Sequence, residues 1–339
     1  IFGDNPNKYY LFIIHHFNSG GGGLEHLNST VLGASRSTYT NPKRYQSFLG
    51  LVAHEYFHLW NVKRLRPIAL GPFDYEVENY TTNLWIAEGF TAYYDNLIVQ
   101  RTSQFSPDEF VNIIQDDYNA VHNQLGNKQQ PLSESSFDAW IKQYRPNENS
   151  SNTNISYYNK GSLIACMLDL AIINRSNGKQ SLDDVMRYAY NEFYKKKNRG
   201  YTDSEFKAVL EKYTGENLDQ FYTDFINGTK DLDLNKYLNY AGLKLVEKQT
   251  VKAPSLGITM NNSDGSEIAT VTRNSAAWIA GLNVKDEIIA INGNRTSDAL
   301  LDVSRMGEND EADFLISRDG LLKTIKVKLK ASESKTMQI

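Results

Sequence analysis

The five-residue stretch HEYFH, residues 54–58, constrains this chain more than any other part of the sequence. Its two histidines are four residues apart. On a helix that spacing puts both rings on one face, one turn apart, where they can hold a single ion. Glu55 lies on an adjacent face, within reach of a water on that ion. This is the pattern of a hydrolytic zinc site, with His54 and His58 as metal ligands and Glu55 as general base.

Mostly apolar residues flank this motif, and they predict a helix over residues 47–66 that lies against a core. The run reads SFLGLVAHEYFHLWNVKRLR. The chain has only six histidines among 339 residues, so a chance match to the motif is uncommon. The alternative is a pair of core histidines bonded to neighbouring groups.

A second amphipathic helix is predicted over residues 84–99, LWIAEGFTAYYDNLIV, and it carries Glu88. A lone carboxylate among bulky apolar side chains is costly unless it is paired or bound to a metal. We therefore expect Glu88 to be the third metal ligand. Glu76 and Glu78 compete for this role, but they lie in a polar stretch just after a proline.

The segment before the zinc motif predicts a buried strand and a glycine-rich turn. Residues 8–17, KYYLFIIHHF, are aromatic and β-branched, which favours the strand, and we expect His15 and His16 to be structural. Residues 20–26, GGGGLEH, let backbone pass close to another chain and end in the carboxylate Glu25. A flexible loop with a solvated carboxylate is the alternative.

Composition excludes several classes of function. The net charge of −4 argues against nucleic acid as a main partner, and no apolar run approaches the length of a membrane span. The single cysteine, Cys166, lies in an apolar run and is expected in the core.

No signal peptide is visible, and a start at Ile1 without methionine suggests a mature or truncated fragment. The compartment is left open, although many Tyr and Asn residues with few thiols fit an extracytoplasmic, for instance periplasmic, bacterial protein.

Beyond residue 105 the pattern becomes mostly helical. Capping boxes at Ser106 and Thr202 predict two helix starts, an apolar run predicts a buried helix over 162–173, and 146–154 reads as a polar loop without packing potential. A boundary is expected near 244–254. Past it, short strands and helices alternate, with turns at Asn-Gly and Asp-Gly.

Several separated stretches together resemble one known family. They are GGGLEH, HEYFHLWNVKRLRP, LWIAEGFTAYY, DAWIKQYRPNENS and SYYNKGSL, within residues 9–243. They are similar to the glycyl aminopeptidases, zinc peptidases of the gluzincin group that are related to the alanyl aminopeptidases. The tail, 253–331, resembles a PDZ domain. The resemblance implies an α+β fold with a thermolysin-like catalytic core over 1–105, a helical part over 106–245 and a small β-rich PDZ-like domain over 253–332.

The resemblance also implies roles for single residues. One zinc ion per chain would be held by His54, His58 and Glu88, with Glu55 as base. Glu25 would bind the free α-amine of the substrate, and Gly22 and Gly23 would pair with its backbone.

Tyr158 would stabilise the tetrahedral intermediate, with Tyr157 as the alternative if the register is off by one. In the PDZ-like tail, Leu256, Gly257 and Ile258 would form a carboxylate loop for a peptide or protein segment.

The implied activity is removal of small N-terminal residues, such as Gly or Ala, from peptides with a free N-terminus. Two alternatives stay open: a thermolysin-type zinc endopeptidase, and a non-catalytic PDZ scaffold. Two departures from the family pattern stand out. The segment 59–87 is longer than in alanyl aminopeptidases, and the family's N-terminal β-rich domain is absent from this chain.

Overall fold

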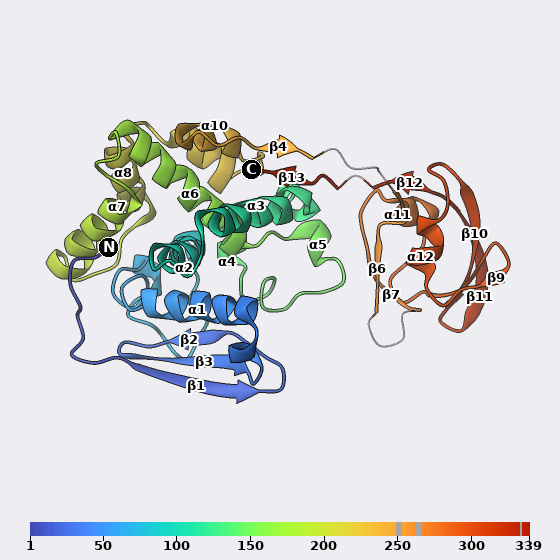
Figure 1. Cartoon of the computed structure of the whole chain (residues 1–339), viewed down its shortest axis with the longest axis horizontal. Helices are drawn as coiled ribbons and strands as arrows, with labels where there is room; N and C mark the ends of the chain where they lie inside the picture. Colours follow the sequence, from blue (N-terminus) through green and yellow to red (C-terminus); the bar gives the residue numbers. More distant parts are fainter. Residues whose placement is uncertain (249–252, 262–265, 333) are drawn as a thin grey trace.

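The computed structural model describes residues 1–248, 253–261, 266–332 and 334–339. Helices and strands occur together in it, as expected for an α+β protein (Figure 1). Buried apolar side chains gather in a large cluster between residues 2 and 245 and in a separate one between 256 and 329. The described residues include no helix long and apolar enough to cross a membrane.

A three-stranded sheet opens the larger body, in the order β1 (Leu11–Phe17), β3 (Ser29–Ser35), β2 (Gly23–Glu25). β1 runs parallel to β3, and β2 runs antiparallel to it. The expected burial of the strand in 8–17 is wrong, because all seven residues of β1 are exposed. The helix α1 (Pro42–Phe57) packs on β2 and β3 and leaves β1 at the outer edge (Figure 1). β3, with alternating burial, was not predicted.

α1 begins where Asn41 caps it, accepting a hydrogen bond from the Arg44 amide, and it ends at Phe57. The prediction of helix through residue 66 is therefore wrong in its second half. The reason is Asn61, whose buried amide donates to the carbonyls of Ile86 and Ala87 and so draws the chain out of the helix.

The helix predicted over 84–99 forms in two parts: a π-helix, Trp85–Gly89, followed by α2 (Phe90–Arg101). π-helical turns occur often at functional sites, and this one carries Glu88. α6 (Tyr157–Arg175), which contains the predicted buried helix, crosses the π-helix at a pair of glycines. A Cβ on Gly89 would lie 2.6 Å from the Cα of Gly161, so the two backbones touch.

Short helices complete the larger body. Both predicted capping boxes are present, at Ser106 and Thr202. The remaining α-helices are α3 (Pro107–Asn123), α4 (Leu132–Phe137), α5 (Ser150–Thr153), α7 (Leu182–Ala189), α8 (Asp203–Thr214), α9 (Asp219–Phe221) and α10 (Leu234–Leu238). Single 3₁₀ or π turns lie at Thr38–Thr40, Ile68–Leu70, Leu125–Lys128, Tyr190–Lys196, Tyr222–Ile226 and Asn239–Ala241. α5 falls in the predicted loop 146–154, and its Asn152 is only 2% exposed, so the expected lack of packing there is wrong.

Short strands and helices alternate in the smaller body, as expected. They are β5 (Pro254–Ser255), β6 (Ile258–Met260), β7 (Ile268–Val271), α11 (Ala276–Ala280), β8 (Glu287–Ile291), β9 (Asn294–Arg295), α12 (Ala299–Ser304), β10 (Glu311–Arg318), β11 (Leu321–Lys328) and β12 (Lys330–Ala331). The short strands β5, β9 and β12 were not predicted. The Asn292-Gly293 and Asp319-Gly320 turns have positive φ, as such turns require. The boundary expected over 244–254 includes residues 249–252, which lie outside the described residues.

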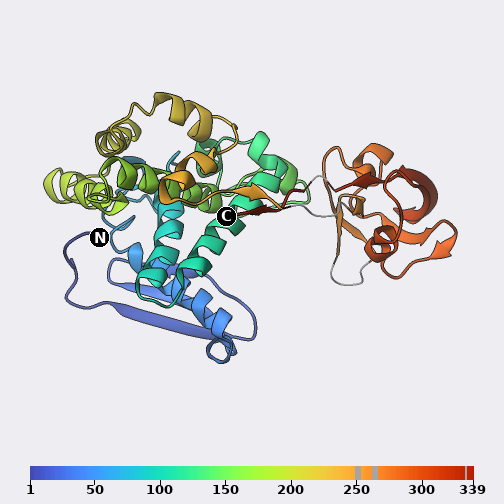
Figure 2. The same ribbon diagram turned by 45° about the horizontal axis from the view of Figure 1, so that its top comes forward.

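The chain returns to the larger body at its C-terminus. β13 (Met337–Gln338) pairs antiparallel with β4 (Val246–Glu247), which leads out of the larger body. In Figures 1 and 2 the C-terminus accordingly lies on the larger body, beside α3. Both ends of the smaller body are therefore connected to the same side of the larger one.

Candidate metal centre and catalytic site

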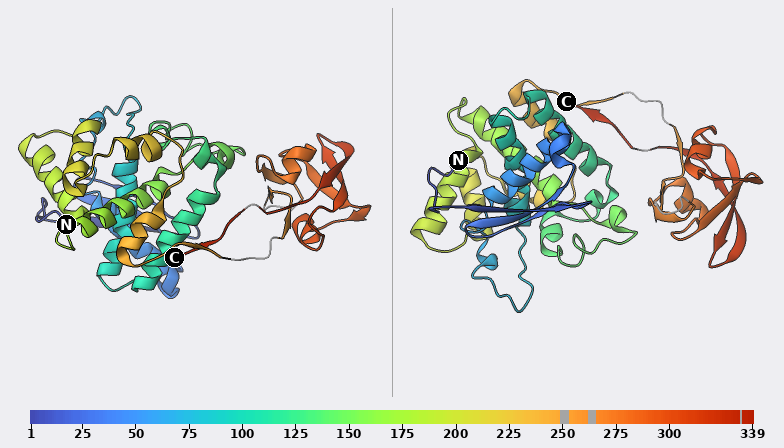
Figure 3. Two further views of the ribbon diagram at one scale, coloured as in Figure 1. Left: turned by 90° about the horizontal axis from the view of Figure 1, so that it is seen from above. Right: turned by 60° about the horizontal axis from the view of Figure 1, so that its bottom comes forward.

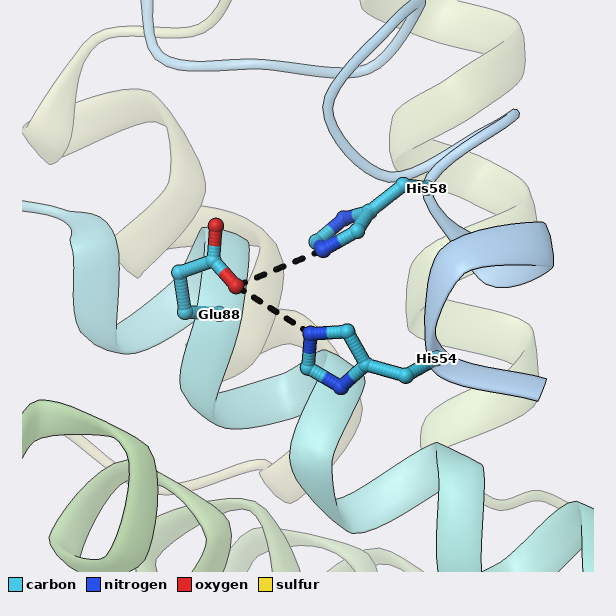
Figure 4. Close-up of side chains that lie close together, drawn as sticks. All are labelled: His54, His58 and Glu88. Atoms are coloured by element: carbon cyan, nitrogen blue, oxygen red, sulfur yellow. Dashed lines mark hydrogen bonds and ion pairs between the residues drawn. The ribbon is translucent and has the colours of Figure 1, made fainter. Parts of the chain in front are cut away.

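The two histidines of the HEYFH motif meet Glu88 at one point. Glu88 Oε2 lies 3.3 Å from Nε2 of His54 and 3.3 Å from Nε2 of His58 (Figure 4). The histidines come from the end of α1 and the carboxylate from the π-helix. Because one atom from each residue lies within 4.8 Å of the others, the three can hold one metal ion.

The other ring nitrogens of the histidines are also bonded. His54 Nδ1 donates to Asp95 Oδ2 at 2.9 Å, and His58 Nδ1 donates to the carbonyl of Asn61 at 2.7 Å. Such bonds fix the tautomer and direct Nε2 toward a metal. The sequence analysis missed Asp95 and Asn61. A signal existed for Asp95, which follows Glu88 by seven residues, or two helical turns, and so lies on the same face.

The two histidines and Glu88 shift one another's pKa values. Burial disfavours a charge on His54, but hydrogen bonds to Asp95 and Glu88 outweigh it and raise the pKa of His54 to about 10. Burial is likewise outweighed at Glu88, where His58 and His54 hold the carboxyl pKa far below its usual value. Two imidazoles and one carboxylate that share a point are a donor set that suits a divalent metal.

Glu55 lies against the metal-ligand cluster and is 5% exposed. Its burial raises the carboxyl pKa to about 7, although His58 and His54 act in the opposite direction. Its Oε2 is buried and has no hydrogen-bond partner among the described residues. An orphaned buried oxygen at this place fits a base that awaits a water molecule. Gly23 makes room for it, because a Cβ there would lie 2.5 Å from the Glu55 carboxyl carbon.

Glu25 reaches the same centre from the end of β2. One oxygen of Glu25, one of Glu55 and one nitrogen of His58 lie within 4.8 Å of one another. The Glu25 carboxylate is already paired, since Lys63 Nζ lies 3.0 Å from Oε1. Lys63, which the sequence analysis did not single out, also lies over the ring of Phe73, 5.5 Å from its centroid.

Three tyrosines, Tyr144, Tyr157 and Tyr158, meet near His54. The hydroxyls of Tyr144 and Tyr158 share a hydrogen bond of 3.0 Å, and Tyr157 donates to Tyr144 at 3.2 Å. The ring of Tyr158 lies 6.2 Å from that of His54, whereas Tyr157 is fully buried behind it. Of the two alternatives, Tyr158 is the one that lines the cavity beside this centre, which is described next. Tyr144 lies in an irregular loop within the stretch DAWIKQYRPNENS, but no role was predicted for it from the sequence.

A cavity of about 640 Å³ adjoins this centre. Its lining includes His54, Glu55 and Tyr158, and also the glycines Gly22 and Gly23. The competing carboxylates lie elsewhere: Glu76 and Glu78 are exposed on a loop that projects from the body, blue in the right panel of Figure 3.

The residues expected to form a carboxylate loop, 256–258, lie in the smaller body. Leu256 and Ile258 are buried in the core of the smaller body. Gly257 has a φ of +72°, and its amide already donates to Ser255 Oγ at 3.1 Å.

Known proteins resemble this chain in part and in whole. Residues 47–164 match the family described as M61 glycyl aminopeptidase. A crystal structure of an aminopeptidase N family protein from Idiomarina loihiensis is 31% identical with a TM-score of 0.91, and the match covers 100% of this chain and 62% of that one. The chain thus spans less than two thirds of that protein.

Two further structures match with a TM-score of 0.22. They are a serine endoprotease from Yersinia pestis (20% identity, 24% of this chain and 30% of that one) and a PDZ domain protein from Parabacteroides distasonis (22% identity, 25% and 22%). No curated protein matches. The chain is therefore similar to M61 glycyl aminopeptidases over 47–164 and to an aminopeptidase N family protein over its whole length, and both likenesses support a peptidase.

Proposed function

We propose that this chain is the catalytic part of a zinc-dependent aminopeptidase that hydrolyses the N-terminal peptide bond of peptides. The observation that carries this proposal is Glu25, a second carboxylate within 4.8 Å of Glu55 and His58. A substrate ammonium bound there would hold the first peptide bond of the substrate over the metal-ligand cluster.

The proposal includes finer points that rest on the family motifs. One zinc ion is held by His54, His58 and Glu88. The catalytic core is thermolysin-like over 1–105 and continues into the helical part, 106–245. Residues 253–332 form a PDZ-like domain that takes a peptide or protein segment. Substrates carry a small first residue such as Gly or Ala.

Three residues, Glu55, Tyr158 and Glu25, have distinct roles in the proposed hydrolysis. When bound, zinc acidifies a water molecule and polarises the scissile carbonyl. Glu55 takes the proton from the attacking water and passes it to the leaving amine. Tyr158 donates a hydrogen bond to the carbonyl oxygen as charge develops on it. Glu25 pairs with the α-ammonium and so places the scissile bond one residue from the N-terminus.

One observation favours a second candidate, a thermolysin-type zinc endopeptidase. Lys63 already pairs with Glu25 at 3.0 Å, so this carboxylate has a cation partner before any substrate arrives. A substrate without a free amine would then leave no charge unpaired at Glu25. The two candidates make opposite predictions for substrates whose amine is blocked.

The test is hydrolysis of Gly and Ala chromogenic amides beside their N-acetylated forms, with and without a zinc chelator. We expect chelator-sensitive cleavage of the free-amine substrates alone. Cleavage of both forms would establish the endopeptidase instead. If neither form is hydrolysed, the result would favour the non-catalytic scaffold.

Glu25→Gln examines the amine site directly. The variant keeps the shape of the side chain but loses the charge that pairs with the ammonium. We expect kcat/KM for free-amine substrates to fall about 100-fold, equivalent to about 3 kcal/mol of lost charge pairing. An exposed carboxylate provides the matched control, Glu78→Gln. A fall of less than threefold would remove Glu25 from the proposed role.

A further inference from the structure

The cavity beside the catalytic centre lies at the far end of β2 from Glu25. Gly22 and Gly23 line it, whereas Glu25 and Lys63 do not. β2 runs from Gly23 to Glu25 and is an edge strand of its sheet. Glu55 lies against Gly23 at the cavity end of β2, with one carboxylate oxygen within 4.8 Å of one from Glu25. A peptide whose amine lies at Glu25 and whose first bond lies at Glu55 therefore continues into this cavity.

Among the residues that the structure describes, the walls of the cavity contain no lysine or arginine. Besides Tyr144 and Tyr158, the ionisable lining groups are His54, which belongs to the metal-ligand cluster, and the carboxylates Glu55 and Asp95. A free dipeptide would place its C-terminal carboxylate about one residue length, roughly 3.5 Å, past the leaving nitrogen. That carboxylate would then face Glu55 with no lysine or arginine to pair with. An amide or a longer peptide avoids this repulsion, because the backbone there is uncharged.

The cavity is roomy because of one glycine in α1. Gly50 is buried and lines the cavity, yet a Cβ built on it meets no atom within 4 Å. It lies one helical turn before His54, on the same face of the helix. Leu51, Phe105 and Ile113 supply apolar wall. A volume of about 640 Å³ lies within the range of roughly 300–1,000 Å³ that holds drug-sized ligands.

We propose that this cavity binds the residues that follow the scissile bond and that Gly50 sets its capacity. The substrates are accordingly oligopeptides with a bulky apolar second residue rather than free dipeptides. This inference rests on the aminopeptidase function proposed above, and it adds the part of the substrate on the leaving side.

Four peptides test the chemistry of the cavity in the wild-type protein: Gly-Leu, Gly-Leu-NH₂, Gly-Leu-Ala and Gly-Gly-NH₂. We expect kcat/KM for Gly-Leu-NH₂ and Gly-Leu-Ala to exceed that for Gly-Leu and for Gly-Gly-NH₂ at least tenfold. If no Gly peptide is cleaved, the aminopeptidase function fails and the inference falls with it. If Gly-Leu is cleaved as fast as its amide, only the inference is overturned.

A substitution that adds a cation should restore the dipeptide. Ser47 lines the cavity, is exposed, and its hydroxyl donates to the Lys43 carbonyl one turn earlier. Ser47→Lys should reduce the preference for Gly-Leu-NH₂ over Gly-Leu at least fivefold. The uncharged control of similar length, Ser47→Gln, should keep the preference. Equal preferences in the two variants would refute the electrostatic part of the inference.

Substitution at Gly50 tests capacity. Gly50→Leu should lower the ratio of kcat/KM for Gly-Leu-NH₂ to that for Gly-Gly-NH₂ at least tenfold. Gly50→Ala should lower the ratio by less, which keeps the test valid if the larger side chain impairs folding. Calorimetric titration of the Glu55→Gln protein gives a readout free of turnover, in which Gly-Leu-NH₂ should bind at least tenfold tighter than Gly-Gly-NH₂. Unchanged ratios in both Gly50 variants would overturn the assignment.

Discussion

At the scale of single residues, the candidate metal centre depends on bonds made behind the ligands. Asp95 holds His54 and the carbonyl of Asn61 holds His58, at 2.9 and 2.7 Å. Both imidazoles therefore present Nε2 to Glu88 before a metal binds. Within the part of the chain that the structure describes, Glu55 makes no such bond at Oε2, which leaves this oxygen open to a proton.

Glu55→Gln should separate chemistry from metal binding. The amide cannot accept a proton, so turnover of Gly amides should fall by about 10²–10⁴-fold, the usual contribution of a general base. Zinc content should stay near one ion per chain, since Glu55 is not among the three proposed ligands. The measurements are kcat and metal content by mass spectrometry. Turnover within tenfold of wild type would reject Glu55 as the base.

Lys160 is a fully buried lysine outside the catalytic centre, hydrogen-bonded to Asn127 at 2.9 Å. Burial lowers its pKa from 10.5 to about 8, against the opposing effect of Asp231. Between these values the unfolded chain binds more protons than the folded one, so the unfolding free energy rises with pH across this window. The full rise is about 3 kcal/mol.

Lys160→Met should remove this rise. Denaturant unfolding of both proteins at pH 7.5–10.5 provides the comparison, with Lys179→Met, which changes an exposed lysine, as control. Parallel curves for wild type and Lys160→Met would contradict the prediction.

At the scale of elements, the site is assembled where α1, the π-helix and α6 meet. The π-helix carries Glu88, and α6 carries Tyr158. Their close crossing depends on Gly89 and Gly161, because a Cβ on Gly161 would lie 2.7 Å from the Trp85 carbonyl oxygen. The position of Glu88, the proposed third ligand, is thus tied to the absence of two side chains.

Gly161→Ala should destabilise the protein by about 1–3 kcal/mol, the usual cost of overpacking, and should weaken zinc binding by displacing the π-helix. Gly50→Ala is the matched comparison in another helix, where the new methyl group meets open space. It should stabilise by about 0.5–1 kcal/mol through helix propensity. Denaturant unfolding and zinc titration measure both effects. Equal stability of the two variants would show that the crossing tolerates a methyl group.

At the scale of the whole molecule, the smaller body is held at both ends. α3 presents Asn119 and Asn123 one turn apart, and each side chain exchanges two hydrogen bonds with the returning backbone. Asn119 pairs with Met337 at 2.9 and 2.7 Å, and Asn123 pairs with Lys335 at 2.8 and 2.8 Å. Asn152 adds a contact between the bodies, since it bonds to the Val271 carbonyl and the Arg273 amide at 2.9 Å each.

The double variant Asn119→Ala and Asn123→Ala should release the returning strand. Limited proteolysis should then cut near the junction of the two bodies at least fivefold faster, while hydrolysis of Gly amides stays within twofold, because neither residue lines the catalytic cavity. Ser204→Ala, an exposed change in α8, serves as control. An unchanged cleavage rate would show that β4 and β13 hold the junction without the asparagines.

Much of the local structure was predictable from the sequence. The capping boxes at Ser106 and Thr202 and the Asn292-Gly293 and Asp319-Gly320 turns form as expected, because each depends on a few neighbouring residues. The meeting of His54 and His58 followed from helical periodicity alone.

Only the tertiary structure decided the rest, because those features depend on what packs where. β1 has the composition of a buried strand, yet it is exposed because α1 packs mainly on its neighbours β2 and β3. Lys63 lies far in sequence from Glu25, so no local pattern marks that pair, and the helical spacing of Asp95 from Glu88 does not reveal its bond to His54. The empty space beside Gly50 is a property of the several helices, loops and the strand β2 that line the cavity together. The sequence by itself determined which chemistry was available, and packing decided which groups meet and what shape of substrate they admit.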